Sequence, residues 1–242
     1  MEPAPPKVSL IVPFYNDQDR LLQRMGAARD FLQAQPYSSE LILVDDGSMT
    51  DRSEEIRQAF PGVQLIRYSP NCGKGYAVRT GMLAAKGEYR FFTDADLPFG
   101  MEPLRLGLDY LERKDFDLVI GDRQAPGSVY HVEQSPMRRL ASKVFTSFIS
   151  RLVITGVKDT QCGFKGFKAP AAELIFRRSR VNRFAFDVEI VYISFKHNLD
   201  LKRIPVKLEH SAGSTLKLHL DSIQMLAEVF RIKWNHLKGY YD

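Results

Sequence analysis

The sequence predicts an α/β protein built on a mainly parallel sheet with helices on both faces. Short apolar runs alternate with stretches of helical spacing through the first half of the chain. The run VSLIVP at residues 8–13 is apolar almost throughout, which is typical of a strand that is covered on both sides. Strands that alternate with helices indicate right-handed crossovers and hence parallel pairing.

The same patterns place the elements along the chain. We expect strands at residues 8–13, 40–44, 63–68, 89–93, 118–121 and 201–209. We expect helices at 20–34, 51–59, from Gly75 to 85, and at 103–113, 137–153, 171–178, 187–197 and 218–237. The expected organisation is a disordered tail at 1–7, one domain at 8–215, and a C-terminal amphipathic helix within 216–242.

Composition narrows the class of protein. A chain of 242 residues, 44% hydrophobic and 26% charged, suits one large soluble domain. Residues 123–183 hold twelve Lys and Arg against three acids, so this half of the chain favours an anionic partner. With two cysteines and no C-x-x-C pair, we expect reduced thiols and no zinc knuckle. The start lacks a signal peptide and no run is long enough to span a bilayer, which predicts a cytosolic protein.

The predicted strand at 89–93 leads into two carboxylates, Asp94 and Asp96. Residues two apart in an extended segment point to the same side, so the two side chains can converge where the strand ends. Carboxylates without a nearby His or Cys are hard ligands that suit Mg²⁺ or Mn²⁺. A solvated acidic turn is the alternative, because a D-x-D pattern is short and common.

Two other polar segments fall at predicted strand ends. Asp45 and Asp46 follow the second strand, where a carboxylate can accept from a base or a ribose hydroxyl or can instead cap the next helix. Lys74 lies between two glycines just before a helix, a setting that favours anions. The surrounding residues match neither a Walker A loop nor a dinucleotide fingerprint.

The second half of the chain adds three candidate segments. Asp159 and Gln161 stand in an unusually polar loop between apolar segments. Asp187 and Glu189 open a helix, either as functional acids or as residues that complement the helix dipole. His210 follows the last predicted strand and is either a ligand or a hydrogen-bonded structural residue.

Taken in order, these motifs resemble the family 2 glycosyltransferases of the GT-A fold, and most of all the dolichyl-phosphate β-glucosyltransferases. The resemblance runs from about residue 8 to residue 234. It is carried by VSLIVPFYN, LILVDDGS, NCGKGYAVRTG, TDADL, DTQCGFK and FDVE. Two departures stand out: Pro98 replaces a side-chain ligand of the mannosyl-transferring cousins, and Gly213-Ser214-Thr215 replaces the usual Gly-Ser-Lys, with Lys217 nearby.

The resemblance implies a role for each matching residue. Donor binding would involve Pro13, Tyr15, Asp45, Asp46, Lys74 and Asp94. The metal, Mg²⁺ or Mn²⁺, would lie at Asp94 and Asp96. The acceptor phosphate would face Arg123 together with Arg138 or Arg139. The residues expected to border the sugar or take part in the reaction are Asp96, Gln161, Asp187, Glu189 and Arg123.

The implied reaction moves a hexose, glucose from UDP-glucose, onto a polyprenyl or dolichyl phosphate with inversion. A phosphate acceptor, whose second pKa is about 6, needs cationic contacts more than a base, whereas a hydroxyl acceptor would need Asp187 or Glu189 as its base. Other nucleotide sugars, including GDP-mannose, a hydroxyl acceptor, and an inactive nucleotide- or membrane-binding module are the alternatives. Nucleic acid is not expected, because the basic half lacks a recognisable motif for it.

A lipid acceptor implies contact with a membrane surface, and two predicted helices suit it. Apolar residues recur at helical spacing, with basic residues beside them, in 137–153 and in 218–237. The same pattern also fits helices docked on their own core. We expect a peripheral protein on the cytoplasmic face of a membrane.

Overall fold

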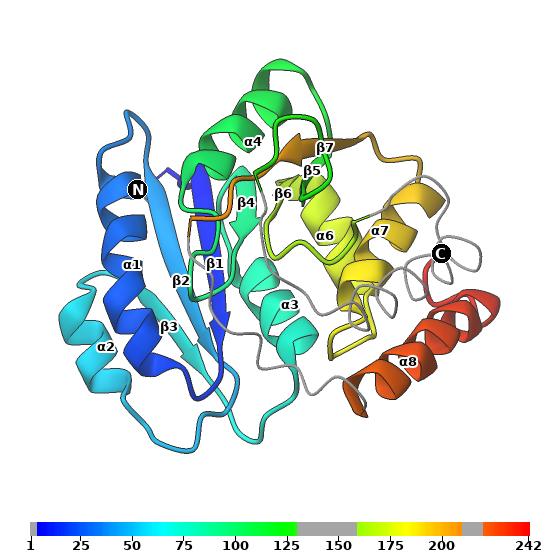
Figure 1. Ribbon diagram of the computed structural model, residues 1–242, viewed down its shortest axis with the longest axis horizontal. Coiled ribbons are helices and arrows are strands. Elements are labelled where there is room, and N and C mark those ends of the chain that lie inside the picture. Colours follow the sequence, from blue (N-terminus) through cyan, green and yellow to red (C-terminus); the bar gives the residue numbers. More distant parts are fainter. Residues whose placement is uncertain (1–3, 130–158, 210–219) are drawn as a thin grey trace.

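The computed structural model describes residues 4–129, 159–209 and 220–242, and these form three layers, helices–sheet–helices (Figure 1). The described strands form one seven-stranded sheet in the order β3-β2-β1-β4-β6-β5-β7. The strands are β1 Val8–Phe14, β2 Ser39–Asp45, β3 Gln64–Arg67, β4 Tyr89–Phe92, β5 Leu118–Asp122, β6 Lys165–Lys168 and β7 Leu201–Pro205. The helices are α1 Gln18–Gln33, α2 Ser53–Ala59, α3 Lys74–Ala84, α4 Glu102–Arg113, α6 Ala169–Arg178, α7 Phe186–Lys196 and α8 Leu220–Leu237.

The sheet is mainly parallel, as predicted, with one exception. β1 pairs in parallel with β2 and β4, β2 with β3, and β5 with β7. β6 was not predicted, and it runs antiparallel between β4 and β5, with Lys165 opposite both Phe92 and Ile120. Because β4 and β5 end where β6 begins, the loop that precedes β6 reaches the same edge of the sheet as the end of β4.

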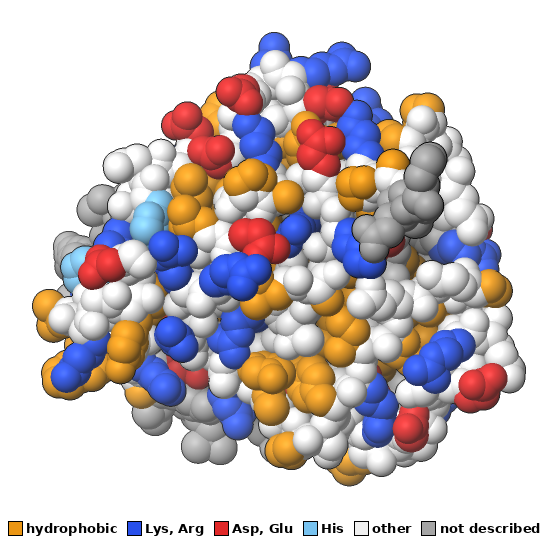
Figure 2. Space-filling view, turned by 180° about the vertical axis from the view of Figure 1, so that it is seen from behind, with side chains coloured by type: hydrophobic (Ala, Val, Ile, Leu, Met, Phe, Trp, Pro, Cys, Tyr) orange, Lys and Arg blue, Asp and Glu red, His pale blue; other side chains and the backbone are white. Residues whose placement is uncertain are grey.

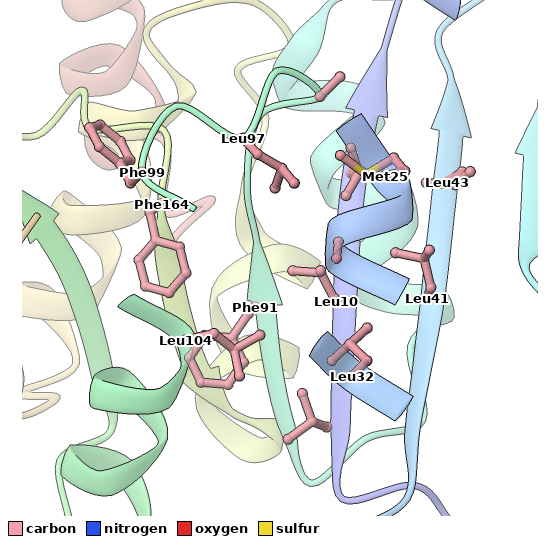
Figure 3. Close-up of a cluster of buried hydrophobic side chains, with 14 of the residues drawn as sticks. Leu10, Met25, Leu32, Leu41, Leu43, Phe91, Leu97, Phe99, Leu104 and Phe164 are labelled. Atoms are coloured by element: carbon pink, nitrogen blue, oxygen red, sulfur yellow. The ribbon is translucent and has the colours of Figure 1, made fainter. Parts of the chain in front are cut away.

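Both faces of the sheet are buried, which accounts for the apolar character of β1. On one face Leu10, Leu41 and Leu43 pack against Met25 and Leu32 of α1 (Figure 3). The same face continues to α2 and α4. The opposite face shares a core with α3, α6 and α7, and α8 joins this core beside α7. Burying one such side chain is worth about 1.5–3 kcal/mol, so a strand covered on both sides gains from nearly every residue.

Two boundaries differ clearly from the prediction. Lys7, expected in a disordered tail, donates its N–H to the Ser38 carbonyl at 2.9 Å. The last strand ends at Pro205 rather than at 209, because residues 206–208 pair with Val129 and the Glu209 N–H donates to the Pro98 carbonyl at 2.8 Å. The predicted helix at 137–153 lies outside the described residues. No helix of the described segments is both long and apolar enough to cross a membrane.

Candidate active site

Three strands of the sheet end side by side at one edge. Phe14, the last residue of β1, pairs with Asp45 at the end of β2, and β4 ends beside β1 at Phe92. The polar segments that follow are therefore neighbours. The Asn16 amide N–H donates to Ser48 Oγ at 2.9 Å, and the Asn16 side chain accepts from the Met49 N–H at 2.8 Å. These bonds join the loops after β1 and β2 into one rim, where Tyr15 is 44% exposed and Pro13 is buried below it.

Asp94 and Asp96 lie in the turn that follows β4, as the sequence predicts. The turn is closed by the Leu97 N–H, which donates to the Asp94 carbonyl at 3.0 Å. Asp96 is half-buried, and burial, then the charge of Asp94, raises the pKa of its carboxyl group. Burial and a second carboxylate both disfavour the charged form of Asp96, so a cation at this place would stabilise it.

Lys74 reaches this turn from the first residue of α3. Its Nζ lies 2.5 Å from Oδ1 of Asp94. Burial is the largest single influence on the Lys74 pKa and lowers it, but Asp94, Asp187 and Asp96 together outweigh burial and raise it. The lysine is therefore an ammonium ion, held where the α3 N-terminus also favours negative charge.

Close packing fixes the start of α3. Gly73 has a φ of 101°, which L side chains rarely adopt, and a Cβ there would lie 2.5 Å from the Asn182 carbonyl oxygen. A Cβ on Gly75 would lie 2.6 Å from Cβ of Phe186 and 2.7 Å from the Val181 carbonyl oxygen. The two glycines thus let the 181–186 segment press against α3, which accounts for the Gly-Lys-Gly motif.

Asp187 and Lys165 extend the charged cluster into the interior. Asp187, in the first turn of α7, forms an ion pair with Lys165, whose side chain is fully buried. Lys165 also donates to the Cys162 carbonyl at 2.9 Å and lies 5.3 Å from the centre of the Phe92 ring. Burial raises the pKa of Asp187, although Lys165 and Lys74 oppose this. The charged cluster therefore runs from the half-buried Asp96 and Asp94 through Lys74 and Asp187 to Lys165 in the core.

Asp45 and Asp46 are both buried but serve different partners. Asp45 accepts from the Ser48 N–H at 2.8 Å and from Nε of Arg67 at 3.0 Å, which leaves acceptor capacity on its carboxylate. Asp46 accepts from Tyr68, Asn71, Cys72 and Gly73, all within 2.9 Å. Asp46 therefore anchors the loop that leads to α3, and its carboxylate oxygens already accept four hydrogen bonds.

The loop before β6 lies against the Asp94 turn. A Cβ on Gly163 would fall 2.1 Å from Oδ2 of Asp94, so a side chain at this position would displace the Asp94 carboxylate. In the same loop Asp159 accepts two bonds of 2.7 Å from the Arg123 guanidinium. Burial raises the pKa of Asp159, but Arg123 outweighs burial and lowers it. Arg123 is thus held by Asp159 at the rim, and Gln161 lies half-buried nearby in the chain; Arg138, Arg139, His210 and Lys217 lie outside the described residues.

Comparison with known protein families identifies the family of this chain. The sequence profile of "Glycosyl transferase family 2" matches residues 9–176, more than two thirds of the chain. The chain belongs to glycosyl transferase family 2. The family expected from the motifs is confirmed, and with it the expectation of an enzyme that transfers a glycosyl group.

Curated relatives of this glycosyltransferase extend the likeness to nearly the whole chain. A dolichyl-phosphate beta-glucosyltransferase of Dictyostelium discoideum is 33% identical over 97% of this chain and 76% of its own length. The proteins of the same name from Saccharomyces cerevisiae and Homo sapiens are 31% and 32% identical, over 97% and 96% of this chain and 76% of theirs.

Solved structures confirm the GT-A fold of this glycosyltransferase. Glucosyl-3-phosphoglycerate synthase from Mycobacterium tuberculosis, crystallised with Mn²⁺, uridine diphosphate and phosphoglyceric acid, superposes with a TM-score of 0.66. The match covers 94% of this chain and 78% of the synthase at 17% identity. The same synthase with Mg²⁺ and uridine diphosphate gives a TM-score of 0.62 at 16% identity. At such identities the likeness establishes the fold.

The residues of this glycosyltransferase fit the divalent metal that the family implies. The turn after β4 offers two carboxylates, one of them with a raised pKa, and a lysine ammonium already lies on the other. Hard oxygen donors of this kind suit Mg²⁺ or Mn²⁺. The described residues contain no group of three or more His, Cys, Asp or Glu that could hold a metal ion.

The structure does not bring Glu189 to the site, contrary to the expected Asp187–Glu189 pair. Residues two apart on a helix point about 200° apart, so the two acids leave α7 in different directions. Glu189 is fully buried and accepts from the N–H groups of Arg180 and Val181 at 2.9 Å and from the Tyr241 hydroxyl at 2.5 Å. It therefore braces the segment that packs on α3 and is not placed to contact a substrate.

This bracing role gives a prediction for stability. In Tyr241→Phe the buried Glu189 carboxylate loses a hydrogen bond, and Asn235 loses its acceptor at 3.1 Å. Because hydrogen bonds to charged groups are worth about 1.5–3 kcal/mol, we expect the free energy of unfolding in urea to fall by that amount. Tyr240→Phe, at a half-exposed ring, is the control and should change it by less than about 0.5 kcal/mol. Equal effects of the two changes would contradict the role of Tyr241.

Two residues near the site were missed by the sequence reasoning. Lys165 closes the DTQCGFK motif, to which the sequence analysis assigns no role at this residue, and the structure pairs it with the buried acid Asp187. Arg20 of α1 lowers the Asp96 pKa through its charge, which places it close to the turn after β4. No spacing in the sequence links residue 20 to residue 96, since only the pairing of β1 with β4 brings them together.

Proposed function

We propose that this glycosyltransferase moves glucose from UDP-glucose to a dolichyl or related polyprenyl phosphate, with inversion at the anomeric carbon. The observation that carries this proposal is the likeness to three dolichyl-phosphate beta-glucosyltransferases over at least 96% of the chain. The geometry at the ends of β1, β2 and β4 supports it, because the residues expected to bind a nucleotide sugar share one edge.

The donor would lie along that edge. Tyr15 and Pro13 would border the base, and Asp45, with acceptor capacity left on its carboxylate, would take a hydrogen bond from the nucleoside. Lys74 would face the diphosphate, where its positive charge and the α3 N-terminus oppose the charge that develops on the leaving group. Asp46 would act indirectly, through the loop that it anchors.

Asp94 and Asp96 would hold Mg²⁺ or Mn²⁺ together with oxygens of the donor. When bound, the metal would supply positive charge against the departing nucleotide diphosphate. The uridine diphosphate complexes of the structurally similar synthase with Mn²⁺ and with Mg²⁺ support this choice of metals. The two carboxylates together with Lys74 also argue against an inactive binding module.

The acid–base arrangement favours a phosphate acceptor over a hydroxyl. A hydroxyl needs a general base, and with Glu189 braced in the interior the remaining acid of the expected pair is Asp187. Asp187 is 5% exposed and already bonded to Lys165, a poor setting for receiving a proton from a substrate. A phosphate monoester is largely ionised at neutral pH and needs only cationic contacts. Arg123 at the rim, with Arg138 or Arg139, would supply them.

The test is a matrix of donors and acceptors. Labelled UDP-glucose, UDP-galactose and GDP-mannose are offered with Mg²⁺ or Mn²⁺ to dolichyl phosphate, to dolichol and to 3-phosphoglycerate. We expect label to enter the organic phase only from UDP-glucose with dolichyl phosphate. Transfer to dolichol would establish a hydroxyl acceptor, transfer to 3-phosphoglycerate a soluble one, and use of another donor would overturn the sugar assignment.

The site of action follows from the acceptor. A polyprenyl phosphate resides in a bilayer, so the chain would work at a membrane surface, and the cytoplasmic face is the side that we propose. The membrane surface and the cytoplasmic face both belong to the function proposed above. Fractionation of cells that express the full chain would test them.

A further inference from the structure

Helix α8 carries apolar residues on two opposite sides. On the inner side Val229 and Ile232 are fully buried in the core that includes α7, and Asn235 is buried beside them. On the outer side Phe230, Trp234 and Leu237 are 58%, 60% and 78% exposed. Residues three and four apart lie along one helix face, so these three form a continuous stripe, which we call the outer stripe. The sequence pattern alone could not separate the two sides.

The outer stripe is a concentration of exposed apolar side chains. Of the ten large hydrophobic residues that are exposed in the described part of the chain, four lie within residues 230–240: the stripe and Tyr240. Scattered exposed residues are normal, whereas a contiguous apolar patch marks an interaction surface. The stripe lines a shallow groove with Ala227, Arg231 and Lys233. In Figure 2 hydrophobic and basic side chains intermix at the corner that α8 occupies.

The charges around the stripe are positive. Arg231 and Lys238 are exposed beside it, and the Lys238 ammonium lies 5.2 Å from the centre of the Trp234 ring. Lys233 lies 5.6 Å from the centre of the Tyr192 ring. Within residues 227–237 of α8 the one acid is Glu228, and it accepts from the Ala185 N–H at 3.1 Å. An occupant of this face must therefore be apolar in the middle and anionic at the rim.

We propose that the outer stripe docks on an anionic membrane surface. Phe230, Trp234 and Leu237 enter the boundary between headgroups and acyl chains, and Arg231, Lys233 and Lys238 contact lipid phosphates. A second copy of this chain fits less well, because a two-fold contact places the same patch against itself and would bring the basic residues together. The proposal deepens the proposed function, since a lipid acceptor would be reached from this surface.

The position of α8 connects docking to the site. Glu228 holds the Ala185 N–H, one residue before α7, and Tyr241 holds Glu189 within α7. Asp187 of the charged cluster lies between these two attachments. A helix that rests on the bilayer through its outer side would therefore hold the start of α7, and the site beside it, near the lipid headgroups.

Trp234 is the only tryptophan in the chain, so its fluorescence reports on this face alone. The full chain is titrated with vesicles of phosphatidylcholine, with and without 30% phosphatidylserine and free of any acceptor. We expect a blue shift of the emission, protection from acrylamide and quenching by brominated lipid, with at least about tenfold tighter binding to the anionic vesicles. Binding without a change in Trp234 emission, or no binding, would overturn the proposal.

Variants that retain Trp234 as the fluorescent reporter test the individual residues of the surface. Phe230→Ser with Leu237→Ser should weaken vesicle binding at least about tenfold, and Arg231→Gln with Lys233→Gln and Lys238→Gln should abolish the preference for anionic lipid. Met49→Ser, at an 83% exposed residue elsewhere, is the matched control and should bind as the natural chain does. Self-association that the serine pair removes, without vesicle binding, would mean that a second copy covers the stripe and would overturn the proposal.

Activity measurements separate this proposal from the proposed function. The serine pair should lose transfer to dolichyl phosphate in vesicles but keep transfer to a short, water-soluble polyprenyl phosphate. Insertion of Trp234 in a chain inactive with every acceptor would overturn the proposed function and uphold the docking surface. Transfer that proceeds equally with vesicle-bound acceptor in the serine pair would overturn the docking surface alone.

Discussion

Asp96→Asn is expected to lower kcat/KM for transfer by about 10³-fold or more. The substitution keeps the size of the side chain but removes one of the two carboxylates at the end of β4. A metal that stabilises a leaving group is worth several kcal/mol, and each 1.36 kcal/mol is a factor of ten in rate. Initial rates over a range of Mn²⁺ concentrations measure the effect, and calorimetric Mn²⁺ titration in the presence of uridine diphosphate measures metal binding separately.

The fold should survive this change. Because burial and Asp94 raise the Asp96 pKa, the ionised carboxylate destabilises the folded chain. The stability contribution of such a group is full below the ordinary carboxyl pKa of about 3.9 and is lost as pH rises through the raised value. Asp96→Asn should remove this loss, so the variant should be at least as stable as the natural chain at neutral pH. Asp109→Asn, on the outside of α4, is the control and should keep full activity.

Retained activity in Asp96→Asn, or unaltered Mn²⁺ binding, would show that the carboxylate pair is not a metal site. A loss of activity accompanied by unfolding would point instead to a structural role for the turn. The two outcomes are distinguished by thermal unfolding of the same preparation.

The strand ends were predictable because the information is local. Apolar runs locate β1, β2 and β4, and the rule that ligands gather at the carboxyl ends of parallel strands then brings Asp45, Lys74 and Asp94 together. The partners of these residues were not predictable in the same way. Whether Asp46 faces a ligand or the Gly73 N–H depends on the path of the 70–73 loop, which periodicity does not encode.

Long-range packing accounts for the remaining differences. β6 was overlooked because its pairing with β4 joins residues more than seventy positions apart, and its four residues include two lysines. The role of Glu189 depends on Tyr241, fifty-two residues further on, so a pair of acids at a helix start was read as a functional pair. The apolar residues of α8 recur on two sides of the helix, and only the packing against α7 shows which side is buried.

Lys74→Met should lower kcat/KM by about 10²- to 10³-fold, the range found when one charge-stabilising group is removed from an active site. Methionine fills the space of the lysine stem but carries no charge. Lys74 lowers the pKa values of both Asp96 and Asp187, so its loss should raise both. Metal binding needs ionised carboxylates, and the acid limb of the pH–rate profile should therefore move to higher pH in the variant.

The direction of this shift separates two roles of Lys74. If the lysine only contacts the diphosphate, the rate falls and the acid limb of the profile stays where it is. If it also compensates the carboxylates, as its 2.5 Å contact with Asp94 indicates, the rate falls and the limb moves. Lys86→Met, at an exposed lysine just beyond α3, controls for the loss of one positive charge and should change neither the rate nor the profile. An unmoved limb in Lys74→Met would contradict the electrostatic coupling of α3 to the turn after β4, and with it the account of why a lysine stands at the first residue of that helix.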